Sequence, residues 1–137
     1  MKKSNLILIF LLAGFVFFVK KRFLESRLRR LRASGKLKKY IDIVARSEDE
    51  LELAAAYYTI GNIYLFDFQD SKSASDYYRK VIDSDSDNYL EDSALFNLGL
   101  CYRESSAQKA EKIFRRLIEE YPESARAKDA EIELSRI

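Results

Sequence analysis

The chain has 137 residues, of which 47% are hydrophobic and 34% are charged, a composition that fits one small folded domain plus an additional segment. Its formal net charge of +2 hides a strong division, because residues 20–39 hold ten bases against one acid, whereas residues 40–137 hold 12 bases against 21 acids. There is no histidine, one cysteine and four scattered glycines, which removes the commonest general base, an intramolecular disulfide and a phosphate-binding loop. We therefore expect no enzyme, no cofactor, no metal site and no small-molecule substrate.

An uninterrupted apolar run extends from Leu6 to Val19, with lysines before it and three bases directly after it. As a helix, 14 residues reach about 21 Å, which is shorter than the roughly 30 Å hydrocarbon core of a bilayer. No small residues follow for a signal peptidase, and no cysteine follows for lipid attachment. We therefore predict a single transmembrane anchor over residues 1–22, with a cleaved signal peptide and a buried helix as alternatives.

Residues 23–46 are predicted to form a basic amphipathic neck and a leading helix. Leucines at positions 24, 28 and 31 give the neck one apolar face, and its bases are suited to contact anionic lipid headgroups. A solvated flank is an equally good interpretation, and nucleic acid is an unlikely partner because no aromatic platform accompanies the bases. The residues assigned to the membrane surface are Lys20, Lys21, Arg22, Arg27, Arg29, Arg30 and Arg32.

A break in the helix is expected at Ala33-Ser34-Gly35, before the leading helix begins. The leading helix is predicted from Lys36 to Arg46, since its apolar residues recur at helical spacing. Those residues, which we expect to pack on the first repeat, are Leu37, Tyr40, Ile41 and Val44.

Residues 47–137 contain an internal repeat. The stretch ASDYYRKVID at 74–83 matches AEKIFRRLIE at 110–119 class for class, 36 residues later. Upstream of each lies a second matched motif, Ala56-x3-Ile60-Gly61-x2-Tyr64 and Ala94-x3-Leu98-Gly99-x2-Tyr102. A period of this length indicates a solenoid of helix pairs. Helices are predicted at 48–66, 71–84, 89–103, 107–121 and 124–137.

Small residues at 61 and 99 are expected to let paired helices approach closely, with aromatic side chains filling the space beside them. Three helix starts carry capping signals, namely Ser47 with Glu50, Ser105 with Gln108, and more weakly Asn88 with Glu91. Cys101 is expected to be a buried, inert thiol. The acid-rich segment 83–88 departs from a calcium loop at its sixth and twelfth positions, so a turn is the better interpretation.

These motifs resemble the tetratricopeptide repeat, whose first helix carries a large apolar residue, Leu-Gly and Tyr, and whose second carries Ala, an aromatic and a closing Pro. The resemblance implies an all-α solenoid of about 2.5 repeats, since Ala130 and Leu134 begin a third unit. It also implies a protein partner bound in the inner groove formed by the first helices. The residues that carry the resemblance are Tyr57, Ile60, Gly61, Tyr64, Ala74, Tyr78 and Val81 in one repeat, and Leu95, Leu98, Gly99, Tyr102, Ala110, Phe114, Leu117 and Pro122 in the next.

The groove positions implied by the resemblance are Ala55, Tyr58, Asn62, Leu65, Ser93, Phe96, Leu100 and Arg103. This surface is mainly apolar and lacks lysine, which suits an amphipathic helix better than a C-terminal carboxylate. The chain's own C-terminal helix is an alternative occupant. We expect Tyr58 and Phe96 to be less buried than Tyr64, Tyr102 and Phe114.

Two functional hypotheses share this fold. The first is a membrane-anchored adaptor that recruits a partner protein through the groove, and the second is a structural subunit of a larger membrane or envelope assembly. Ten bases after the apolar run and two before it place the repeats in the cytoplasm by the positive-inside rule. The segment from Tyr121 to Leu134 is similar to bacterial envelope members of the repeat family, which makes a periplasmic position the alternative.

Overall fold

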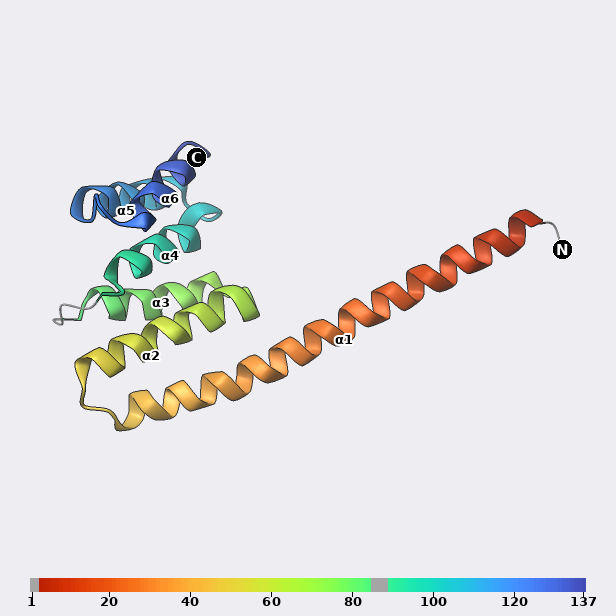
Figure 1. The fold of residues 1–137 in the computed structure, drawn as a ribbon, viewed down its shortest axis with the longest axis horizontal. Helices are drawn as coiled ribbons and strands as arrows, with labels where there is room; N and C mark the ends of the chain where they lie inside the picture. Colours follow the sequence, from red (N-terminus) through yellow and green to blue (C-terminus); the bar gives the residue numbers. More distant parts are fainter. Residues whose placement is uncertain (1–2, 85–88) are drawn as a thin grey trace.

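The computed structural model describes residues 3–84 and 89–137, and it describes side chains from Leu11 onward, except that of Ala13. The described part is entirely helical: α1 (Lys3–Arg46), α2 (Glu50–Asn62), a π-helical continuation η1 (Ile63–Phe68), α3 (Ser71–Ile82), α4 (Glu91–Arg103), α5 (Ala107–Glu120) and α6 (Ala125–Leu134). Helices α2 to α6 stack in chain order, and α1 projects from one end of the stack (Figure 1).

The repeat frame is confirmed by how paired helices meet. A Cβ atom added at Gly61 would lie 2.7 Å from Cε1 of Tyr78, and one added at Gly99 would lie 2.4 Å from Cε1 of Phe114. Both rings are fully buried, so α3 and α5 approach their partners more closely than any larger residue at 61 or 99 would allow. Each pair α2–α3 and α4–α5 is therefore one repeat, and α6 is the first helix of a third.

Helix α1 runs without interruption through Ala33, Ser34 and Gly35, so the predicted break is wrong. A glycine inside a helix costs only about 1 kcal/mol relative to alanine, and strong helix formers flank this one on both sides. Ala33 is 2% exposed, which shows that the supposed break is a packing contact. The predicted packing face is correct in part, because Ile41 is 43% exposed and Ile43 is partly buried in its place.

Two of the three predicted capping positions require correction. Helix α2 is capped by Asp49, whose carboxylate accepts hydrogen bonds from the backbone N–H groups of Leu51 and Glu52, and Ser47 instead donates to the Glu52 carboxylate at 2.5 Å. Helix α5 is capped by Ser106, one residue after the predicted Ser105. Helix α4 begins after Leu90, and the predicted capping residue Asn88 lies outside the described residues.

The first helix of the first repeat ends in a π-helical turn that the sequence did not predict. Gln69 closes this turn in the left-handed conformation, with φ 58° and ψ 36°. Its backbone N–H donates to Tyr64 O, and that of Asp70 donates to the same oxygen at 2.8 Å. Asp70 then caps α3, and the hydrogen bond from the Ser73 hydroxyl lowers the pKa of its carboxyl group.

Candidate partner-binding groove

The eight predicted groove residues lie along α2, η1 and α4, the first helices of the two complete repeats. Seven are partly buried and Arg103 is exposed, so each retains some accessible surface. The apolar members are Ala55, Tyr58, Leu65, Phe96 and Leu100. These positions therefore form a mixed aromatic and aliphatic set with accessible surface, and their role in binding a partner stays a prediction.

Polar groups in this face hold the two repeats together. Asn62 Oδ1 accepts a hydrogen bond from the Tyr78 hydroxyl at 2.7 Å and another from Asn97 Nδ2 at 3.0 Å. Asn97 also donates to the hydroxyl of Tyr58 at 3.4 Å, and its side chain is buried. Burial raises the pKa of Tyr78 above its ordinary value, so its hydroxyl stays protonated and donates. Capture of a carboxylate by Asn62 and Asn97 would compete with this network.

Two aromatic side chains of the groove rest on the rings that fill the repeat cores. Tyr58 packs on Tyr78 with ring centroids 5.9 Å apart, and Phe96 packs on Phe114 at 5.8 Å. The guanidinium of Arg126, from α6, lies 5.4 Å from the Phe96 ring centroid. Both aromatic side chains are thus held in place, so less side-chain conformational entropy would be lost when a partner binds.

Arg103, at the end of the groove, forms an ion pair with Glu133 of α6, at 2.7 Å. Glu133 also pairs with Arg136 at 2.7 Å, and its carboxylate is largely buried. The hydrogen bond from Arg103 lowers the pKa of Glu133, which keeps the carboxylate charged at neutral pH. Sequence reasoning missed Glu133, although it stands 36 residues after the buried Asn97, at the same position of a first helix.

The expected difference in burial between groove and core aromatics is confirmed only for Phe114. Tyr64 and Tyr102 are partly buried, in the same class as Tyr58 and Phe96. Tyr64 stacks on Tyr77 at 5.6 Å between centroids, at the outer edge of the repeat. Tyr102 lies under two cationic side chains, Arg79 and Lys109, which leave part of its ring accessible.

The C-terminal helix packs beside α4, where Arg126 and Glu133 contact the groove residues Phe96 and Arg103, and it does not lie across the first helices of both repeats (Figure 1). Its buried residues Ala127 and Ala130 belong to its packing face, and Ala130 joins the core of the second repeat. Leu134 packs against the same core. Helix α6 therefore extends the solenoid by one first helix (Figure 1).

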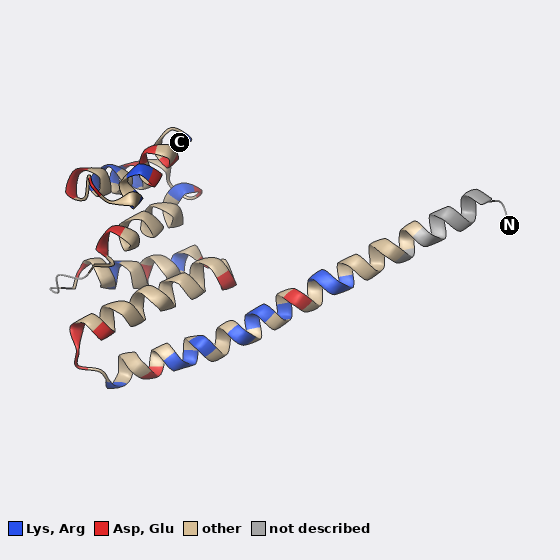
Figure 2. Cartoon of the chain, in the orientation of Figure 1, with Lys and Arg blue, Asp and Glu red and all other residues tan. Residues whose placement is uncertain are grey.

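The bases predicted for a membrane surface, from Lys20 to Arg32, are all exposed and lie along the middle of α1 (Figure 2). Apolar side chains between them are also uncovered, for example Phe23 at 63% and Leu31 at 68% exposed. Within the described residues, no helix is long and apolar enough to cross a membrane. The apolar run 6–19 lies partly outside the residues with described side chains.

Cys101 is buried, as predicted, and burial raises the pKa of its thiol to about 12, so it is protonated at neutral pH. Among the described side chains, no group of three acids or cysteines is placed to hold a metal ion. Most of the acid-rich segment 83–88 lies outside the described residues.

Two tetratricopeptide-repeat family models match the chain, one at residues 54–88 and the other at residues 93–124. These ranges cover the pairs α2–α3 and α4–α5, which the glycine contacts identify as the complete repeats. No curated protein and no solved structure matches the chain significantly. The two matches and the stacked helix pairs support placing residues 54–124 of this chain in the tetratricopeptide-repeat family.

Proposed function

We propose that this protein is a membrane-tethered adaptor that binds a partner protein through the inner groove of its repeats. The observation that carries the proposal is the face of α2 and α4, where the accessible aromatics Tyr58 and Phe96 lie on buried rings. Fixed aromatic side chains beside aliphatic ones are the usual anchors of protein interfaces. An amphipathic helix is the partner element that fits a face of this kind.

A photo-crosslinking residue in the groove should give specific adducts in native membranes. We expect covalent protein adducts from the full chain when the probe replaces Leu65 or Leu100, because both side chains lie on the partly accessible face. The matched control is the same probe at Tyr89, which is 79% exposed in the turn before α4. Adding Tyr58→Ala and Phe96→Ala should remove the groove adducts, and a thermal melt by circular dichroism should show that the variant remains folded.

Adducts of equal yield from Tyr89 and from the groove positions would contradict a groove-bound partner. Adducts that survive in the folded double variant would place the partner on another surface.

The tether rests on residues 6–19 of the sequence and on the uncovered apolar and basic side chains that follow in α1. In this proposal the apolar run enters the bilayer, the bases contact anionic headgroups, and the repeats lie on the cytoplasmic side by the positive-inside rule. A periplasmic position for the repeats remains the alternative.

The full chain should stay with the membrane pellet after a carbonate wash, with its N-terminal lysines still present by mass spectrometry. Replacing Phe15 and Phe18 with lysine should release it, because each charge placed at the centre of an inserted helix costs about 3 kcal/mol. The control, Phe23→Lys with Leu31→Lys, places the same charges in the exposed neck and should not release the chain. Release of the unmodified chain, or a mature N-terminus beyond Arg22, would contradict the tether.

A further inference from the structure

The C-terminal part of α1 carries a third copy of the motif found in the second helices of the repeats. Residues 33–42 read ASGKLKKYID, against ASDYYRKVID at 74–83 and AEKIFRRLIE at 110–119. Each copy has alanine, an apolar residue four positions later, then two bases, two apolar or aromatic residues and an acid. Ala33 is 2% exposed, and its counterparts Ala74 and Ala110 are fully buried. This part of α1 therefore packs on α2 as a second helix packs on the first helix of the next repeat.

In each complete repeat the second helix also contacts the first helix of its own repeat. Helix α1 has no such neighbour among the described residues, because 3–46 form one continuous helix. The vacant side is an open groove of about 400 Å³ between α1 and the first repeat. Its lining includes Lys36, Lys39, Tyr40, Thr59, Ile63 and Phe66, and Phe66 is 56% exposed.

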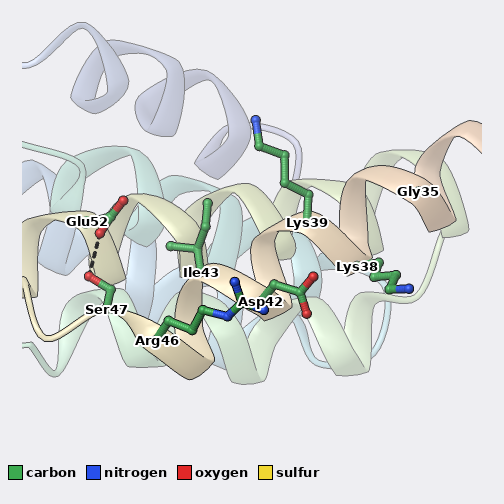
Figure 3. A pocket seen from close by; sticks show the side chains of 8 residues that line it. All are labelled: Gly35, Lys38, Lys39, Asp42, Ile43, Arg46, Ser47 and Glu52. Carbon is green, nitrogen blue, oxygen red and sulfur yellow. Dashed lines mark hydrogen bonds between the residues drawn. The ribbon is translucent and has the colours of Figure 1, made fainter.

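Residues at matched positions of α3 and α1 differ in burial, and the difference shows that one side of α1 is uncovered. Tyr78 and Val81 of α3 are both 0% exposed, whereas their counterparts in α1, Leu37 and Tyr40, are only partly buried. A second pocket, which shares Lys39 with this groove, lies toward the end of α1 and is lined by Ile43 and Glu52 among others (Figure 3). Within the described residues, no first helix therefore covers this side of α1.

Helix α6 presents the complementary gap at the opposite end of the stack (Figure 1). It is a first helix, and among the described residues no second helix packs on its side that bears Glu131. Ile132 of α6 is 51% exposed and Ile137 is 45% exposed. An uncovered first helix at one end and an uncovered second helix at the other could join two copies of the chain.

The repeat register identifies the side chains that would meet. In the first repeat, Tyr57 of the first helix contacts Tyr77 of the second, with centroids 6.3 Å apart, and Lys80 Nζ lies 5.1 Å from the Tyr57 ring. The counterpart of Tyr57 in α6 is Glu131, which is 36 residues after the matched position in α4.

The counterparts of Tyr77 and Lys80 in α1 are Lys36 and Lys39, both 41 residues earlier. Both lysines line the vacant groove. An aromatic cluster inside the first repeat would thus be replaced, between two copies, by Glu131 facing two lysines. At these matched positions the two surfaces carry opposite charges, and the groove also holds Asp67 on the side of the first repeat.

Side-chain size is complementary as well. The close contact of the first repeat joins Gly61 to the Tyr78 ring. The matched residues are Ser135 after α6 and Leu37 in α1, so a slightly larger residue would meet a shorter side chain. The combined side-chain volume of the pair Ser135 and Leu37 is therefore close to that of the pair Gly61 and Tyr78.

We propose that α6 of one copy docks in the groove beside α1 of a second copy, so that the two chains together complete a repeat. The contact joins different surfaces of the two copies, and such head-to-tail contacts generate rings or filaments. The docking groove shares Asn62 with the partner-binding groove, but Tyr58 and Phe96 do not line it, so substitutions at these two aromatics separate self-association from partner binding. The Tyr58→Ala and Phe96→Ala variant should still self-associate even if the adaptor proposal fails.

Charge reversal in the full chain, solubilised in a mild detergent, tests the contact by sedimentation velocity over a range of concentrations. Lys39→Glu and Glu131→Lys should each weaken self-association about tenfold, because an attraction becomes a repulsion in a partly enclosed groove. The chain that carries both changes should recover part of the affinity, because only one of the two lysines that face Glu131 is reversed with it. Lys72→Glu is the control, since Lys72 is exposed on α3 and lines neither the groove nor the pocket beside it.

Disulfide trapping gives a second readout that does not depend on affinity. A tagged chain with Lys39→Cys, mixed with an untagged chain with Glu131→Cys, should form a tagged–untagged dimer under mild oxidation. A tagged chain with Lys72→Cys in place of Lys39→Cys should form no such dimer with the Glu131→Cys chain, because Lys72 lies on the exposed surface of α3. Equal trapping by the Lys72→Cys chain, or unchanged association in both single reversals, would overturn the proposal. Failure of the double reversal to recover affinity would also overturn it.

Discussion

Replacing Gly99 with leucine is expected to lower the free energy of unfolding by about 3 kcal/mol or more, one of the largest effects available from a single residue. Even the first added atom, Cβ, would lie 2.4 Å from Cε1 of Phe114 and 2.7 Å from Cζ. The Phe114 ring is fully buried and packs beneath Phe96, so it cannot rotate away. Overpacking of a filled core typically costs 1 to 3 kcal/mol and occasionally more. Thermal and urea denaturation of the full chain, followed by circular dichroism, measures the change.

Gly35→Ala is the matched control for this substitution. Gly35 lies inside α1, and no atom outside its own helix lies within 4 Å of an added Cβ. The substitution should stabilise α1 by about 0.5 to 1 kcal/mol, because alanine loses less backbone entropy in a helix than glycine does. An unchanged unfolding free energy for Gly99→Leu would mean that α4 and α5 do not pair as the structure has them.

Gly61 and Gly99 show why the repeats could be predicted from sequence. The pairing of α2–α3 and α4–α5 depends on a small residue in the first helix and a large ring in the second, and both recur at a fixed spacing. Local patterns of this kind also locate helices well. The prediction of 71–84 compares with α3 at Ser71–Ile82, and that of 107–121 compares with α5 at Ala107–Glu120.

The contacts within the groove could not be predicted in the same way. Asn62 meets Asn97, 35 residues away, and Arg103 meets Glu133, 30 residues away. The repeat register places these residues on facing helices, but hydrogen-bond partners depend on side-chain rotamers that no spacing determines. The sequence therefore places these positions on the first helices, their role in a groove stays a prediction, and the structure shows which of their polar groups already bind each other.

The capping errors have a similar physical origin. Ser47 and Ser105 both satisfy a capping box, yet the neighbouring Asp49 and Ser106 cap α2 and α5. Several residues near each start have side chains able to accept the first backbone N–H groups. The path of the preceding helix and turn decides which of these side chains reaches the N–H groups.

The continuity of α1 was predicted wrongly because Ala33-Ser34-Gly35 was considered without the repeat motif that contains it. Read with residues 36–42, the same alanine occupies the position of Ala74 and Ala110, at a close helix contact. Helices α3 and α5 begin three residues before this alanine and continue past it, so the motif argues against a break at 33–35.

Ser34→Pro tests that continuity directly. Ser34 is exposed, and the only contact that the structure gives its hydroxyl is with Arg30 O in its own helix, at 2.9 Å, so proline would act through the backbone. Proline inside a helix removes one hydrogen bond and clashes with the carbonyl four residues earlier, at a cost of about 3 kcal/mol or more. We expect α1 to bend beside Ala33 and the neck to lose its fixed direction relative to the repeats.

Spin labels at Glu25→Cys and Asp42→Cys measure this bend by electron paramagnetic resonance, in a Cys101→Ala background. The two positions are 17 residues apart, so a continuous helix separates their backbones by about 26 Å. The chain with the natural Ser34 and the Ser34→Ala control should both give one narrow distance distribution, and Ser34→Pro should give a broader one. A broad distribution with Ser34 itself would restore the flexible break, and α1 could then no longer hold the neck and the repeats in one orientation.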